Sequence, residues 1–168
     1  MCVLCCVWGF FLMRRGASGA TLFTCTTLFS SLGGGIGYFD HAVSGRMDWH
    51  RNGEVLYEDG YSTNLIANEA IKIINEKNNE SPLFLYVAFN APHTPIQAEK
   101  KDIELMNHIK DKKERIYAAN IFALDRAVGR IINSINANEL SDNTLIVFFS
   151  DIGPVHDIDP VSGVVAAD

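Results

Sequence analysis

The apolar and polar positions of the chain follow two kinds of pattern, one typical of helices and one typical of buried strands. In residues 62–77, Ile66, Ala70 and Ile74 recur at intervals of four, which places them on one face of a helix. The polar residues that open this pattern are expected to cap the N-terminus of the helix. Residues 112–137 show a second, longer amphipathic pattern and predict a second helix.

Two uninterrupted apolar runs predict strands. Residues 83–89 read LFLYVAF, and residues 144–150 read TLIVFFS. Such runs are typical of strands that are buried on both faces, as in a parallel sheet. The long helix between them would serve as the crossover that neighbouring parallel strands require. The pattern therefore predicts an α/β fold with a mostly parallel sheet, in which these two strands are neighbours.

The first 35 residues differ from the rest of the chain. They hold all four cysteines, and they carry Arg14 and Arg15 but no acidic residue. The apolar run 3–13 has the length of a signal-peptide core, but its arginines follow the run, whereas signal peptides carry positive charge before it. Because a bilayer-spanning helix needs about 20 apolar residues, the run argues against a membrane anchor. Residues 1–35 are thus an atypical segment, either signal-like or not native to the fold, and residues 36–168 form the domain.

Charge and cysteine content exclude several classes of protein. The formal net charge is −6, whereas nucleic-acid binders usually carry a basic surface, so we expect no nucleic-acid partner. Residues 36–168 contain no cysteine. A disulfide framework or a thiolate metal site within that domain is therefore excluded.

Two polar residues follow the predicted strands. His93 lies in the loop after the first strand, and Asp151 directly follows the second. Because ligands bind at the carboxyl ends of strands in open α/β sheets, we expect both residues at the same sheet edge. Pro92 and Pro95 flank His93 and should stiffen its loop, which suits an anion-binding residue. Each residue also has an ordinary interpretation, a packed or exposed histidine and an aspartate that caps a turn.

Five short motifs, in this order, resemble the sulfatase family, and in particular its arylsulfatase B group. The motifs are GYSTN (60–64), PLFLY (82–86), APHTP (91–95), LDRAVG (124–129) and VFFSD (147–151). Each motif is short, but their order and spacing agree with the family from Phe29 to Gly153. On this resemblance, residues 36–168 are part of a sulfatase catalytic domain.

The resemblance implies an alkaline-phosphatase-like α/β sandwich, incomplete in this chain, and the hydrolysis of sulfate monoesters such as sulfated glycans. Family members attack sulfur with a formylglycine made from a cysteine, and a calcium ion neutralises the sulfate oxygens. By position, His93 matches a substrate-binding histidine that contacts sulfate, and Asp151 matches a calcium ligand. A lysosomal or secretory location is also implied.

The chain departs from the family pattern at the positions of the catalytic nucleophile and of the calcium ligands. No cysteine stands in the Cys-x-Pro/Ala-x-Arg motif that yields formylglycine, so no catalytic residue is assigned. Ile152 occupies the Asn position of the family's Asp-Asn-Gly, and its side chain has no oxygen. Because calcium takes about 6–8 oxygen ligands, Asp151 cannot close a site by itself. The family's Asp-Asp pair, its Lys-Trp-His segment and its later lysine are also not found.

Three interpretations stay open. In the first, the chain is a sulfatase whose sequence is truncated. In the second, it is a truncated or pseudogene-derived product with at most a binding role. The third is another member of the superfamily, such as a phosphodiesterase, against which the five motifs argue. In the first two cases we expect the chain to be inactive alone. We also expect apolar surface on at least one side of the sheet, because the chain would be cut from a larger domain.

Overall fold

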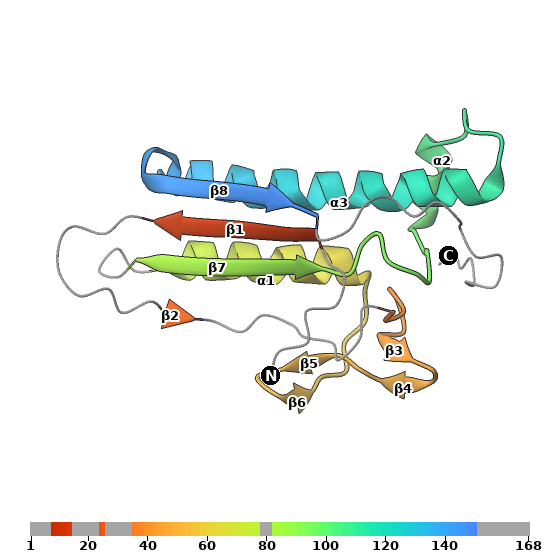
Figure 1. The fold of residues 1–168 in the computed structure, drawn as a ribbon, viewed down its shortest axis with the longest axis horizontal. Helices are drawn as coiled ribbons and strands as arrows, with labels where there is room; N and C mark the ends of the chain where they lie inside the picture. Colours follow the sequence, from red (N-terminus) through yellow and green to blue (C-terminus); the bar gives the residue numbers. More distant parts are fainter. Residues whose placement is uncertain (1–7, 15–23, 26–34, 78–81, 151–168) are drawn as a thin grey trace.

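A computed structural model describes residues 8–14, 24–25, 35–77 and 82–150 of the chain. One mixed sheet has the strand order β2-β7-β1-β8, and helices α1 and α3 run side by side behind it (Figure 1). The strands of this sheet are β1 (Trp8–Arg14), β2 (Thr24–Cys25), β7 (Leu83–Phe89) and β8 (Thr144–Phe149). The helices are α1 (Ser62–Glu76), α2 (Lys100–Leu105) and α3 (Lys112–Ala137), and a short 3-10 turn (Ser141–Asn143) precedes β8.

The segment before α1 forms two small hairpins. The hairpins pair β3 (Ala42–Val43) with β4 (Arg46–Met47), and β5 (His50–Arg51) with β6 (Glu54–Val55). Trp49, between the two hairpins, is buried and stacks on the equally buried ring of His41, with centroids 4.7 Å apart. The hairpins therefore have a small aromatic contact of their own.

The predicted helices and strands are confirmed, but the expected cap of α1 is wrong. The residue that precedes α1 is Tyr61, and no side chain caps the helix there. Ser62 is buried, and its hydroxyl donates to Asn90 Oδ1 at 2.9 Å. In α3, by contrast, Asp111 accepts from the backbone N–H groups of Lys113 and Glu114, an ordinary N-terminal cap. The hydroxyl of Ser62 thus bonds α1 to the first residue of the loop after β7 instead of capping the helix end.

The prediction that residues 83–89 and 144–150 are neighbouring strands is wrong. β1 lies between β7 and β8 and is antiparallel to both, with Phe10 opposite Val87 on one side and Phe148 on the other. β7 and β8 therefore run in the same direction, and the pairing of β2 with β7 is parallel. The sheet in the described residues is mixed instead of mostly parallel. The physical reason is that β1 is itself an apolar run, whose backbone N–H and C=O groups are satisfied by pairing on both sides.

β1 lies within residues 1–35, the segment whose composition differs from that of the rest of the chain. That division at residues 35 and 36, with residues 36–168 as the domain, stays a prediction. Among the described residues, none of the helices is long and apolar enough to cross a membrane.

The core lies between β7 and the two long helices. Burial alternates along β7, so that Leu83, Leu85, Val87 and Phe89 all point toward the same side and are buried. They join one hydrophobic cluster with residues of α1 and α3. The residues contributed by the helices include Ile66, Ala70, Ile74, Ala123, Leu124, Ala127 and Ile131. The helical face predicted for α1 is therefore the face that packs.

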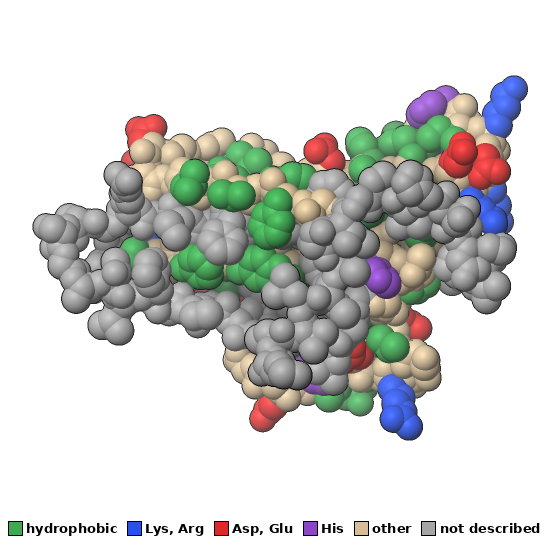
Figure 2. All heavy atoms as spheres, in the orientation of Figure 1, with side chains coloured by type: hydrophobic (Ala, Val, Ile, Leu, Met, Phe, Trp, Pro, Cys, Tyr) green, Lys and Arg blue, Asp and Glu red, His purple; other side chains and the backbone are tan. Residues whose placement is uncertain are grey.

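β8 keeps large apolar side chains at the surface. Leu145 is 59% exposed and Val147 is 39% exposed. Figure 2 shows hydrophobic side chains gathered over the sheet on this face of the molecule. The expectation of apolar surface beside the sheet is thereby confirmed for this part of the chain.

Candidate functional site

His93 lies in the loop that leaves the carboxyl end of β7. The His93 backbone N–H donates to the carbonyl of Asn90, the first loop residue, at 2.8 Å. Pro92 and Pro95, on either side of His93, both follow cis peptide bonds. The His93 side chain is partly buried. Gly35 lies beside it at ordinary van der Waals distance, since a Cβ on Gly35 would lie 3.8 Å from His93 Cε1.

One nitrogen of the His93 ring is held by the backbone. Nδ1 lies 2.6 Å from the carbonyl oxygen of Thr94. Because a carbonyl can only accept, Nδ1 must carry a hydrogen and donate it. Within the described part of the chain, no hydrogen bond engages Nε2. Nε2 is thus the atom that can meet a ligand, and in the protonated ring it presents an N–H to an anion.

The carboxyl ends of β7 and β8 lie on either side of the start of β1. Phe89, the last residue of β7, pairs with Trp8, and Phe149, the last residue of β8, pairs with Gly9. The chain therefore leaves both strands at the same sheet edge, as expected from their common direction. Asp151 lies outside the described residues, so its placement beside His93 stays a prediction.

A buried tyrosine holds the His93 loop from below. The Tyr38 hydroxyl is 2.9 Å from the His93 carbonyl and 3.1 Å from the Asn90 carbonyl, and it is the donor to both. The backbone N–H of Tyr38 donates to Gln97 Oε1 at 2.7 Å. Burial raises the pKa of Tyr38 well above its usual value, and the neighbouring Tyr61 adds to the shift. Tyr38 is therefore a neutral donor fixed beneath the loop.

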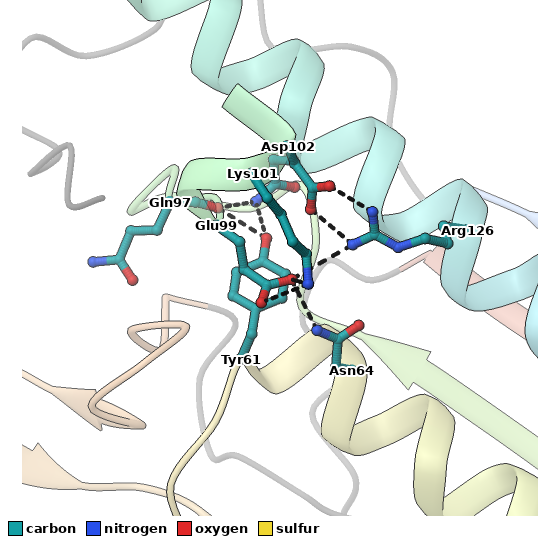
Figure 3. Close-up of polar contacts among 8 residues, drawn as sticks. Tyr61, Asn64, Gln97, Glu99, Lys101, Asp102 and Arg126 are labelled. Carbon is teal, nitrogen blue, oxygen red and sulfur yellow. Dashed lines mark hydrogen bonds and ion pairs between the residues drawn. The ribbon is translucent and has the colours of Figure 1, made fainter. Parts of the chain in front are cut away.

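Tyr61 stacks on Tyr38, with ring centroids 5.3 Å apart, and fastens the far end of the same loop. Its hydroxyl donates to the Gln97 carbonyl at 2.9 Å and accepts from Asn120 Nδ2 at 3.1 Å. Asn120, which is fully buried on α3, also donates to the Gln97 carbonyl at 2.7 Å. Burial raises the pKa of Tyr61 as well. These bonds join the loop to α3 (Figure 3).

A cluster of charged residues continues this layer between α2, α3 and α1 (Figure 3). Arg126 donates two hydrogen bonds to Asp102, 2.5 Å from Nη1 to Oδ1 and 2.7 Å from Nη2 to Oδ2. Glu99 accepts from Asn64 at 3.0 Å and from Lys101 at 3.0 Å. The charges in this cluster satisfy one another, which is the arrangement of a structural network.

This network was not predicted from the sequence. Tyr61 and Asn64 stand in the GYSTN motif, and Arg126 stands in LDRAVG, so the signal was their place in the family motifs. Neither periodicity nor spacing brings these residues together, because they lie on different elements.

A calcium site does not form in the part of the chain that the structure describes. No group of three or more His, Cys, Asp or Glu side chains gathers there as potential metal ligands. The residue after Asp151 is Ile152, whose side chain has no oxygen. The donor set therefore does not fit a cation that takes about 6–8 oxygen ligands.

Comparisons with known proteins agree with the five sequence motifs. The profile of the family described as Sulfatase matches residues 18–161. Arylsulfatase J of Mus musculus is 32% identical over 136 residues, which are 76% of this chain and 23% of that protein. The uncharacterized sulfatase YdeN of Escherichia coli (strain K12) is 32% identical over 109 residues, 64% of this chain and 20% of that protein.

The fold has a solved counterpart. The crystal structure of Ps i-CgsB in complex with k-i-k-neocarrahexaose is similar to this chain with a TM-score of 0.62 and 31% sequence identity. The similarity covers 68% of this chain and 29% of that chain. The present chain thus spans less than a third of the length of each of these three proteins.

Proposed function

Because the chain belongs to the sulfatase family, with the alkaline-phosphatase-like α/β fold of its solved relatives, we propose that it forms part of a sulfuric ester hydrolase in which His93 binds the sulfate group of the substrate. The observation that carries this proposal is the bond from His93 Nδ1 to the Thr94 carbonyl. That bond fixes the ring and directs its other nitrogen away from the backbone.

The chemistry that we assign to His93 is anion binding. When the ring is protonated, the Nε2–H group donates a charge-assisted hydrogen bond to a sulfate oxygen. The hydroxyl of Tyr38 already fixes the loop that carries His93. Anion binding therefore costs little conformational entropy of the loop.

Sulfate ester hydrolysis also needs a nucleophile and neutralisation of the sulfate charge. None of the four cysteines of this sequence stands in a formylglycine motif. We therefore propose that the polypeptide of residues 1–168 binds the anion but does not turn it over, because binding without attack gives no product. Family members hold calcium, and Asp151 is the proposed contribution of this chain to such a site.

The substrate class that we propose is a sulfated glycan. The support is the relative Ps i-CgsB, whose structure holds k-i-k-neocarrahexaose. A lysosomal or secretory location is proposed on the same family basis. The alternative to an enzyme part is a product with a binding role only.

Sulfate titration by calorimetry tests the role of His93. We expect the chain to bind inorganic sulfate, and His93→Ala to weaken binding by about tenfold, the value of one charge-assisted bond. His108→Ala is the matched control, because His108 is exposed in the loop after α2. Equal sulfate affinity of the wild type and His93→Ala would contradict the proposal.

A further inference from the structure

We propose that Tyr38 is a positioning residue for His93: its buried hydroxyl fixes the loop so that the Nδ1–H group of the ring donates to the Thr94 carbonyl and, in the protonated ring, the Nε2–H group faces the anion. This inference rests on the proposed function of His93 and names a residue that acts through it. Tyr38 does not touch the anion in this account.

The contacts of Tyr38 are concentrated on the turn that carries His93. Its hydroxyl is within 3.1 Å of the Asn90 carbonyl and 2.9 Å of the His93 carbonyl, and it has one hydrogen to share between them. The Asn90 carbonyl also receives the His93 N–H. The same phenol therefore braces both ends of the Asn90–His93 turn.

The position of this turn decides which nitrogen of the neutral His93 ring carries the hydrogen. Nδ1 can donate to the Thr94 carbonyl only while the backbone of residues 93 and 94 keeps its present course. Among the described residues, the Tyr38 hydroxyl is the one hydrogen-bond donor to the His93 carbonyl. Without that donor, the turn loses a bond whose net value corresponds to roughly a two- to tenfold change in an equilibrium.

Tyr61 provides a matched comparison inside the same layer. It stacks on Tyr38, it is buried, and its hydroxyl also bonds to the loop. Its partner is the Gln97 carbonyl, however, four residues beyond His93. Tyr61→Phe and Tyr38→Phe both remove one buried phenol hydroxyl, but only the second removes a bond at His93 itself.

The experiment is nitrogen NMR of the His93 ring in the full chain, at a pH high enough for a neutral ring. In the wild type and in Tyr61→Phe, we expect the shifts of a ring with its hydrogen on Nδ1. In Tyr38→Phe, we expect a mixture of tautomers, because free imidazole side chains favour hydrogen on Nε2. A general loss of stability would not select the tautomer of one ring, so this readout separates positioning from folding.

Sulfate titration of the same three proteins, at a pH low enough to protonate the ring, completes the test. We expect Tyr38→Phe to weaken sulfate binding by roughly two- to tenfold, with Tyr61→Phe close to the wild type. If Tyr38→Phe keeps the wild-type tautomer and sulfate affinity, the inference is wrong. If the tautomer changes but no protein binds sulfate, Tyr38 positions His93 and the proposed function of His93 is the part that fails.

A second variant guards against misfolding of Tyr38→Phe. Replacing Tyr38 with 3,5-difluorotyrosine retains the hydroxyl and strengthens it as a donor, so the His93 tautomer should remain on Nδ1 and the sulfate affinity should not fall. A fluorinated protein in which His93 shifts toward hydrogen on Nε2 would overturn the inference independently of the phenylalanine variant.

Discussion

Asp102 and Arg126 form a two-bond ion pair that joins α2 to α3, with N–O distances of 2.5 and 2.7 Å. Asp102 has no exposed surface, whereas the Arg126 side chain is 32% exposed. The bond to Asp102 raises the pKa of Arg126 above its usual value. Asp102 is therefore the partner that needs the ion pair, because a buried carboxylate without a cation destabilises the fold.

Removing the arginine should destabilise the chain more than removing both partners. We expect Arg126→Met to lower the free energy of unfolding by about 3 kcal/mol, because it leaves Asp102 buried without its cation. The double variant Asp102→Asn/Arg126→Met should lose less. Urea unfolding measures both values, and an equal or greater loss in the double variant would show that the buried charge is not the cause.

The neighbouring lysine gives a control for this ion pair. Lys101 also pairs with Glu99, but its side chain is 60% exposed. Lys101→Met should change the free energy of unfolding by less than about 1 kcal/mol, the usual value of an exposed ion pair.

The two buried tyrosines should make the fold sensitive to alkali. Burial raises the pKa of Tyr38 and of Tyr61 in the folded chain. In the unfolded chain both groups lose their protons near pH 10. The folded state then holds more protons than the unfolded state, so stability is complete below about pH 10 and falls as the pH rises further.

The measurement is the urea midpoint as a function of pH. We expect it to drop above about pH 10 in the wild type. The Tyr38→Phe/Tyr61→Phe double variant lacks both protons and should show a shallower drop. Parallel curves for the two proteins would mean that other groups cause the alkaline loss.

The exposed strand β8 should make the chain associate. Leu145 and Val147 lie on the same face of β8 and are both exposed. Exposed apolar patches promote association, so we expect poor soluble expression and large particles in light scattering. Replacing both residues with threonine should reduce the particle size without lowering the melting temperature. A monodisperse wild type that melts cooperatively would contradict this expectation.

Leu85 is the control for a buried leucine, because it has the same side chain as the exposed Leu145 but is completely buried in β7. Leu85→Thr should cost several kcal/mol of stability, since it puts a hydroxyl into the core and removes apolar contacts.

Local patterns in the sequence were sufficient to predict most of the fold. The four-residue spacing of Ile66, Ala70 and Ile74 identified the buried face of α1, and the apolar runs identified β7 and β8. The predicted strand order is wrong, because the sequence places the apolar run of β1 in an atypical segment that is either signal-like or not native to the fold. Pairing between distant strands leaves no local signal that distinguishes a central strand from such a segment.

The candidate site was predictable only in part. The position of His93 after a strand was visible in the sequence, and the sulfate-binding role came from the family resemblance. The bond from Tyr38 to the His93 loop joins residues 55 positions apart, so no local pattern reports it.

The most direct test of the whole account is the hydrolysis of a chromogenic aryl sulfate by purified residues 1–168 with added calcium, beside His93→Ala. We expect no turnover by either protein, because no cysteine stands in a formylglycine motif. Turnover by the wild type that His93→Ala loses would contradict it, since that result requires a nucleophile in this chain.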